Sequence, residues 1–318
     1  MINQEGLSRD CLRLFFWYPL RWCILLMPVR PGIRLLRRLG DLYFRFSRGK
    51  TRLLRQNLKR LPLKGAACED EIIRGYFRNH YVDQLFILLF PRFTRETIQD
   101  LVEIEGLDRL KRCLERGNGV VFVHGHFGPV HLPLVVFSLL GYPMKQIGNP
   151  SDRGLSWIGR RVAYRLRMRY EGRIPAEIIK ADGYLRPVYT SLRQNGIIMT
   201  TGDGTGTESK FGRQGRFSLF GQPVNLPLGP ARLAEKTGAA LLPLFVLPSE
   251  KKMFKIVIVD EFSSQMQGHA RWVDITGKFA ALLEKFIMKS PEYMHFLDRF
   301  HPGAFILKDD AAPKDLSN

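Results

Sequence analysis

Hydrophobic side chains recur at three- and four-residue steps through the first third of the chain. The stretches RLLRQNLKRL (52–61) and EIIRGYFRNHYVDQLFILLF (71–90) follow this helical period, and Pro91 ends the second one. Most of residues 35–93 is therefore predicted to form helices that pack outside a sheet. Another helical stretch is predicted over residues 101–114.

Short apolar runs of a different kind predict β-strands further along. Val120–Val123 is apolar at every position, which is typical of a central parallel strand covered on both faces. Further strands are predicted over residues 196–201, 240–247 and 254–262. Because helical material separates these strands, we predict an α/β fold class with a central sheet, mostly parallel or mixed, flanked by helices. Ligands bind such sheets at the carboxyl ends of the strands.

The N-terminal segment CLRLFFWYPLRWCILLMP (11–28) is the most apolar part of the chain. It approaches the length of a membrane span, but Arg13, Pro19 and Arg21 interrupt it, which is costly for a helix that crosses hydrocarbon. A shallow membrane-associated helix at the interface fits better. The side chains predicted to face acyl chains are Phe15, Leu20, Ile24 and Leu25.

Two other interpretations of this segment compete. A helix buried in a soluble core would show a similar apolar run. A signal peptide would also be apolar, but no small-residue cleavage site follows Met27. We expect residues 1–34 to form an interfacial or anchoring region, residues 35–305 one folded domain, and residues 306–318 a flexible tail.

The charge balance narrows the class of partner. The 318 residues include 49 Lys and Arg against 30 Asp and Glu, a formal net charge of +19. Residues 1–60 hold 14 of the basic side chains and three of the acidic ones, interleaved with the apolar segment. This mixture favours an anionic membrane surface, and nucleic acid is not an expected partner. The four scattered cysteines indicate neither a disulfide framework nor a zinc knuckle, which favours a reducing cytoplasm.

Two polar loops follow predicted strands. The first, HGHFGPVH (124–131), holds three histidines, and the second, GDGTGTESKFGRQGRF (202–217), follows the strand at 196–201. As a metal site, His124, His126 and His131 would offer three imidazoles, although no clear fourth ligand follows in the later loops. His269, His295 and His301 stand in unpromising contexts for that purpose. A purely structural role for the three loop histidines is the second interpretation.

The third interpretation of the loop histidines is acid/base catalysis by His126. Pro129 stands at the first turn of a predicted helix, so His126 precedes a helix N-terminus. Free backbone N–H groups near Gly128 would there stabilise a developing oxyanion. Acyl transfer needs this arrangement, because a neutral imidazole removes the proton of a hydroxyl or amine as it attacks a thioester carbonyl.

The two loops and their surroundings resemble a known family. VHGHFGPVH, followed by FSLFGQPVNLPLGPARLAEKTGAALLPLF (217–245), is similar to the bacterial lipid A biosynthesis acyltransferases, the lauroyl and myristoyl transferases of the lysophospholipid acyltransferase superfamily. The likeness extends over nearly all of residues 10–300. It implies a glycerolipid acyltransferase-like fold with the acyltransferase domain over residues 35–305. It also implies an enzyme, without a metal or other cofactor, that moves a fatty acyl group from acyl carrier protein or coenzyme A to a lipid or glycolipid.

One position departs from the family pattern. That pattern has a carboxylate after the catalytic histidine and four further residues, and here His131 takes its place. A neutral imidazole orients its partner but supplies no negative charge. We therefore expect His131 to orient His126 and a carboxylate of the second loop, Asp203 or Glu208, to supply the charge. Loss of activity, leaving a lipid-binding relative, is the alternative.

Basic side chains between and within the loops are candidates for substrate binding. Residues 152–173 carry seven Arg and two acidic side chains with aromatics interleaved. Arginine binds phosphate through two parallel hydrogen bonds, so this segment suits an anionic lipid or an acidic carrier protein. The candidates are Arg153, Arg160, Arg161, Arg213 and Arg216.

The sequence thus predicts a lipid acyltransferase at the cytoplasmic face of the inner membrane, with His126 as general base. Its partners would be an acyl carrier protein or acyl-coenzyme A donor, a membrane lipid or glycolipid acceptor and the membrane surface. A metal-dependent hydrolase built on the histidine cluster is a further alternative. Neither a GxSxG nucleophile elbow nor a P-loop is present.

Overall fold

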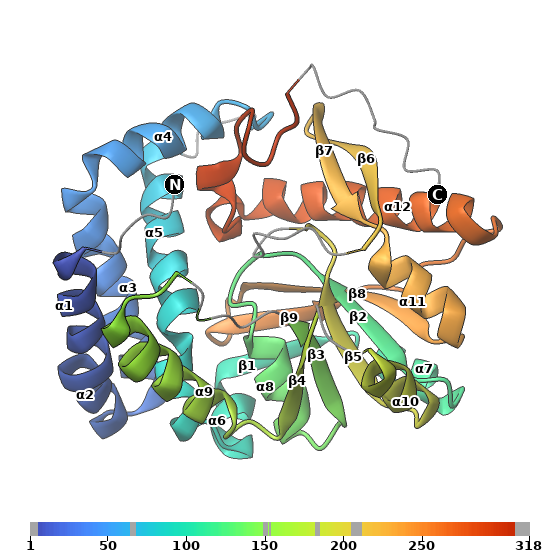
Figure 1. Ribbon diagram of the computed structural model, residues 1–318, viewed down its shortest axis with the longest axis horizontal. Coiled ribbons are helices and arrows are strands. Elements are labelled where there is room, and N and C mark those ends of the chain that lie inside the picture. The colour runs from blue at the N-terminus through green and yellow to red at the C-terminus, as the bar shows by residue number, and fades with distance from the viewer. Residues whose placement is uncertain are drawn as a thin grey trace.

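A seven-stranded sheet forms the centre of the structure, a computed structural model that describes residues 6–63, 68–148, 152, 154–181, 185–204 and 212–308 (Figure 1). Its strands are β1 (Val102–Glu105), β2 (Val120–His124), β3 (Met144–Gly148), β4 (Ala176–Lys180), β5 (Ile197–Thr201), β8 (Ala240–Pro248) and β9 (Phe254–Ile258). They are ordered β1-β9-β8-β2-β5-β3-β4, and a separate antiparallel hairpin joins β6 (Gln214–Leu219) to β7 (Gln222–Pro227).

All neighbours in the large sheet run parallel except β8 and β9. The predicted α/β class with a mostly parallel sheet flanked by helices is therefore confirmed. The strand predicted over residues 254–262 ends at Ile258. The stretch 101–114, predicted as one helix, is β1 followed by α7, because Gly106 adopts a left-handed conformation between them.

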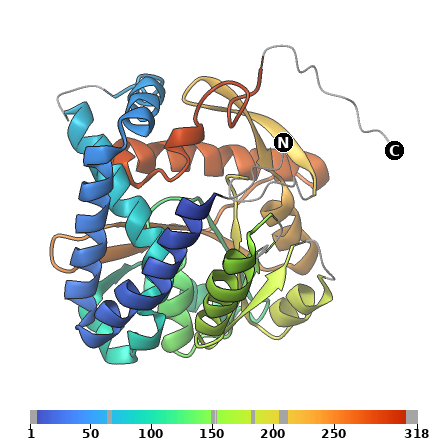
Figure 2. The same ribbon diagram turned by 60° about the vertical axis from the view of Figure 1, so that its left-hand side comes forward.

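Helices cover both faces of the sheet (Figures 1 and 2). The principal helices are α3 (Val29–Phe46), α4 (Arg48–Leu58), α5 (Glu69–Leu85), α6 (Arg95–Leu101), α7 (Leu107–Glu115), α8 (Leu132–Leu139), α9 (Arg165–Glu171), α10 (Arg186–Arg193), α11 (Gly229–Thr237) and α12 (Gly268–Lys289). A 3-10 turn (Phe86–Arg92) extends α5, and two more follow α12, at Pro291–Tyr293 and Leu297–Arg299. The helices predicted over residues 35–93 are thus present.

Strand β2 shows why a central strand is apolar at every position. Val121 and Val123 pack in one cluster with α10, α11 and α12, whereas Val120 and Phe122 pack in the other with α7 and α8. Successive side chains of a strand point to opposite faces, and here both faces are core. Strand β2 is consequently covered by core side chains on both faces.

The N-terminal segment lies against the outside of this core. It consists of α1 (Leu7–Phe15), a π-helical turn (Phe16–Leu20) and α2 (Arg21–Leu26), with Pro19 inside the turn. The part of the chain that the structure describes holds no helix long and apolar enough to cross a membrane. The prediction that Leu20 and Ile24 face acyl chains is wrong, because both side chains are buried against the domain. The exposed apolar residues are Leu7, Leu12, Phe15, Tyr18, Trp22 and Leu26.

Helices α3 and α5 lie side by side at unusually close range. A Cβ atom on Gly40 of α3 would come within 2.6 Å of the Phe77 carbonyl oxygen and the Arg78 Cα of α5. Only a glycine allows this approach without a shift of backbone. The contact fixes α3, and with it the arginines of its neighbouring turns, against the domain.

Candidate active site

The register of two central strands brings the two polar loops together. In the parallel pair of β2 and β5, His124 lies opposite Thr201, so both strands end at the same edge. The Gly202 amide continues the pairing by donating to the His124 carbonyl, at 2.8 Å. Residues two positions beyond each strand end are therefore neighbours. These residues are His126 and Asp203.

Glycines allow this close approach. A Cβ atom on Gly202 would lie 2.7 Å from side-chain atoms of Val123 and Phe279. A Cβ atom on Gly125 would come within 3.0 Å of Leu283 and 3.3 Å of the Asp203 carboxylate. Larger residues at either position would push the loops apart.

Asp203 holds His126 at two points. Its Oδ1 atom lies 2.9 Å from Nδ1 of the imidazole, and its Oδ2 atom accepts a hydrogen bond from the His126 backbone N–H. Asp203 is fully buried, whereas the His126 side chain is 24% exposed. Since an ionised carboxylate only accepts hydrogen bonds, Nδ1 carries the proton, and the basic lone pair of the neutral ring is the one on Nε2.

The electrostatics of the pair favour the imidazolium form. Burial lowers the pKa of His126, but the charge of Asp203 and its hydrogen bond outweigh burial, so the net pKa is raised above 6.5. Asp83 raises this pKa further, and Arg299 lowers it. A proton taken up by His126 is thus stabilised by a carboxylate that water does not reach.

Two segments that the sequence did not point to support the first loop. Asp83, near the end of α5, accepts a hydrogen bond from the Val130 backbone N–H at 2.9 Å. His295, expected to stand in an unpromising context, donates from Nε2 to the Gly128 carbonyl at 2.6 Å, and its amide donates to the His126 carbonyl at 3.0 Å. Met294 forms an antiparallel bridge with Phe127. No periodicity or motif in the sequence signals these long-range contacts.

The other two loop histidines have different surroundings. His124 is buried, donates from Nδ1 to the Gly125 carbonyl at 3.0 Å, and its Nε2 atom has no hydrogen-bond partner in the described structure. Burial lowers the pKa of His124 to about 4. His131 is the N-cap residue just before α8, with its ring beside Phe90, and burial lowers its pKa as well. Both rings are therefore neutral near pH 7.

The geometry differs from two expectations. His131 was expected to orient His126, but the atom on the His126 Nδ1 side is an oxygen of Asp203. Backbone amides near Gly128 were expected to bind an oxyanion, but the amide of Gly128 itself, whose φ is +66°, donates to the Tyr293 carbonyl at 2.9 Å. Glu208 and Arg153 lie outside the described residues.

The remaining predicted binding residues are all exposed. Arg160 and Arg161 stand on the π-helical turn Gly159–Tyr164 before α9, and Arg216 lies on β6, with Arg213 just before it. The three loop histidines do not converge on one point, and the described residues hold no group of three metal-ligating side chains. The arrangement supports proton transfer by one imidazole.

A family model and curated relatives match this chain. The family model described as "Bacterial lipid A biosynthesis acyltransferase" matches residues 8–301. A phosphatidylinositol mannoside acyltransferase of Mycolicibacterium smegmatis is 27% identical over 198 residues, 60% of this chain and 61% of that protein. A protein of the same name from Mycobacterium tuberculosis is 27% identical over 203 residues, 60% of this chain and 59% of its own length. The match thus spans about three fifths of these curated relatives.

The raised pKa of His126 gives a direct test of the pair. Asp203→Asn removes the negative charge, so we expect the pKa of His126, followed by NMR of ¹³C-labelled histidine, to fall below its wild-type value. Asp260→Asn is the matched control, because Asp260 is 77% exposed and pairs with Arg109. Equal pKa values in wild type and Asp203→Asn contradict the pairing.

The raised pKa of His126 also predicts that the stability of the fold depends on pH. Because the folded-state pKa of His126 is raised, the pair stabilises the fold below the ordinary pKa of about 6.5. This contribution is lost as the pH rises through the folded-state pKa. Asp203→Asn should remove it from the free energy of unfolding.

Proposed function

This chain belongs to the bacterial lipid A biosynthesis acyltransferase family, and from that premise we propose that it transfers a fatty acyl group from a thioester to a hydroxyl or amine of a lipid or glycolipid. The observation that carries the proposal is the pair of His126 and the fully buried Asp203 at the carboxyl edge of the sheet. The names of the relatives, phosphatidylinositol mannoside acyltransferases, support a glycolipid acceptor.

Each part of the pair has a role in this reaction. Nε2 of His126 takes the proton of the acceptor as its oxygen or nitrogen attacks the thioester carbonyl. Asp203 fixes the tautomer that carries its proton on Nδ1, and it stabilises the imidazolium that forms. When the tetrahedral intermediate collapses, the carbon–sulfur bond breaks, and the imidazolium returns its proton to the leaving thiolate. The donor is acyl carrier protein or coenzyme A.

The alternative of an inactive lipid-binding relative rests on the missing carboxylate at position 131. Asp203, 2.9 Å from the imidazole, supplies a carboxylate from the neighbouring strand end. This contact favours an active enzyme. We propose for His131 a packing role beside Phe90.

Transfer assays with acyl-carrier-protein and acyl-coenzyme A thioesters and membrane lipid extracts test the proposal. We expect His126→Ala to lose at least about 10³-fold in kcat/KM, because general-base catalysis and the paired charge are both removed. For wild type, kcat/KM should rise with pH through the raised pKa of His126.

His131→Asn is the matched control in the same loop, and we expect it to retain kcat/KM within about tenfold. No transfer by wild type with either donor, or equal transfer by wild type and His126→Ala, contradicts the proposed function. A loss in His131→Asn as large as that in His126→Ala contradicts the packing role.

We also propose that the exposed apolar face of α1 and α2 lies on the cytoplasmic leaflet of the inner membrane. Leu12 is 53%, Phe15 46% and Trp22 56% exposed. The face continues to Trp157, 68% exposed, because neighbouring Ser156 donates to Asp10 of α1 at 2.5 Å. Arg160 and Arg161 stand beside Trp157 in sequence and are exposed, which suits anionic lipid headgroups.

Vesicle binding tests this surface. Replacing Leu12, Phe15 and Trp22 together by Ser removes apolar area that would enter the lipid, so affinity for phosphatidylglycerol-containing vesicles should fall at least about 30-fold. Met266→Ser is the control, because Met266 is 52% exposed before α12. Wild-type affinity in the triple variant, with an unchanged unfolding temperature, contradicts this placement.

A further inference from the structure

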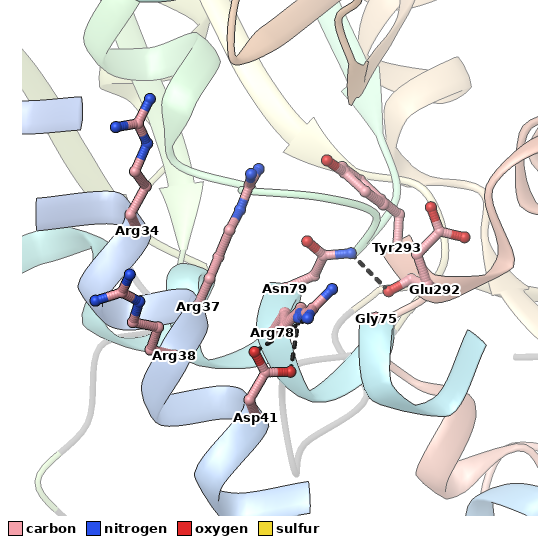
Figure 3. Close-up of a pocket in the computed structure, with 9 residues that line it drawn as sticks. All are labelled: Arg34, Arg37, Arg38, Asp41, Gly75, Arg78, Asn79, Glu292 and Tyr293. Carbon is pink, nitrogen blue, oxygen red and sulfur yellow. Dashed lines mark hydrogen bonds and ion pairs between the residues drawn. The ribbon is translucent and has the colours of Figure 1, made fainter. Parts of the chain in front are cut away.

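An arginine-rich cavity of about 450 Å³ lies between α3, α5 and the turn Pro291–Tyr293. Figure 3 shows its lining, and His126 is not part of it. The residues that matter here are Arg34, Arg37, Arg38 and Asp41 from α3, Arg78 from α5, and Tyr293. Its volume is in the range of small-molecule sites.

The positive charge of this cavity is only partly balanced. Arg37 and Arg38 follow Arg34 by three and four residues and precede Asp41 by four and three, so all of them lie on the same side of α3. Asp41 is already engaged by α5, because Arg78 binds it through two hydrogen bonds of 2.7 and 3.0 Å and Arg74 through one of 2.5 Å.

Arg34, Arg37 and Arg38 have no ion-pair partner among the residues that the structure describes. Like charges at this spacing repel one another on a helix. Glu292 also lines the cavity, but burial raises its pKa, which disfavours its negative form. A bound anion would offset the repulsion.

The cavity adjoins the catalytic loop. Tyr293, which forms part of its wall, accepts the hydrogen bond from the Gly128 amide, and its ring centroid lies 5.7 Å from that of Phe127. The guanidinium of Arg37 lies 5.9 Å from the ring centroid of Phe254, at the start of β9. Phe254 pairs with Pro248 at the carboxyl end of β8. The cavity is thus at the edge of the sheet where His126 stands.

We propose that this cavity is a phosphate-binding subsite that holds a phosphate group of a substrate beside the catalytic loop. The planar guanidinium groups of Arg34, Arg37 and Arg38, which all line this cavity, match phosphate oxygens in pairs. The assignment rests on the proposed function, whose substrates offer two phosphate sources: the headgroup of a phospholipid-type acceptor, or the phosphates of a coenzyme A or phosphopantetheine donor.

Binding measurements separate this subsite from catalysis. Binding is measured in a His126→Ala background, so that the result does not depend on acyl transfer. Calorimetry gives the Kd of free coenzyme A and of dihexanoylphosphatidic acid. Each lost charge-assisted hydrogen bond should raise the Kd about tenfold or more. Arg34→Gln and Arg37→Gln should therefore each weaken the binding of one of these ligands by that factor. Arg45→Gln, exposed on the same helix outside the cavity, should change it less than twofold.

The pattern of losses identifies the source. Weakening of coenzyme A alone assigns the phosphate of the donor, and weakening of the phosphatidic acid alone assigns that of the acceptor. Arg37→Lys keeps the charge without the planar fork and should give an intermediate loss, with an unfolding temperature like that of the parent. If neither ligand binds the parent, or if both bind Arg34→Gln and Arg37→Gln as tightly as Arg45→Gln, the subsite is refuted.

Discussion

A carboxylate without solvent access must be compensated inside the protein, and the site is organised around that requirement. Asp203 is fully buried, and both of its oxygens are directed to His126, one to the imidazole and one to the backbone. Burying an unpaired charge would cost several kcal/mol. The side chain and the main chain of His126 are therefore both held by one carboxylate, which fixes the imidazole on its loop.

Other parts of the structure hold His126 and Asp203 in place. Parallel pairing of β2 with β5 brings the two strand ends together, and the glycines beside each residue remove the bulk between them. From the other side, Asp83 of α5 and His295 after α12 bind the backbone of the histidine loop. The loop is thus fixed by segments from three distant parts of the chain, and Tyr293 joins it to the arginine cavity of α3 and α5.

The local sequence pattern predicts several strands and the two candidate residues, but not the contacts that depend on how distant segments pack. The apolar runs predicted β2, β5, β8 and β9, because a buried central strand is hydrophobic throughout. Strands β3 and β4 were missed, since MKQIG and AEIIK mix polar and apolar positions near the edge of the sheet. His126 and Asp203 stand out by their loops, but their pairing depends on strand order, which periodicity does not encode. Asp83 and His295 carry no local signal at all.

The claim that His126 and Asp203 act as one unit is tested most directly by a double-mutant cycle on the transfer rate. The account predicts that Asp203→Asn alone slows transfer roughly 10²- to 10⁴-fold, yet costs less than about threefold when added to His126→Ala, because the charge then has no imidazole to stabilise. If the double variant is slower than His126→Ala by the full factor of the single Asp203→Asn variant, the two residues act independently and the account is contradicted.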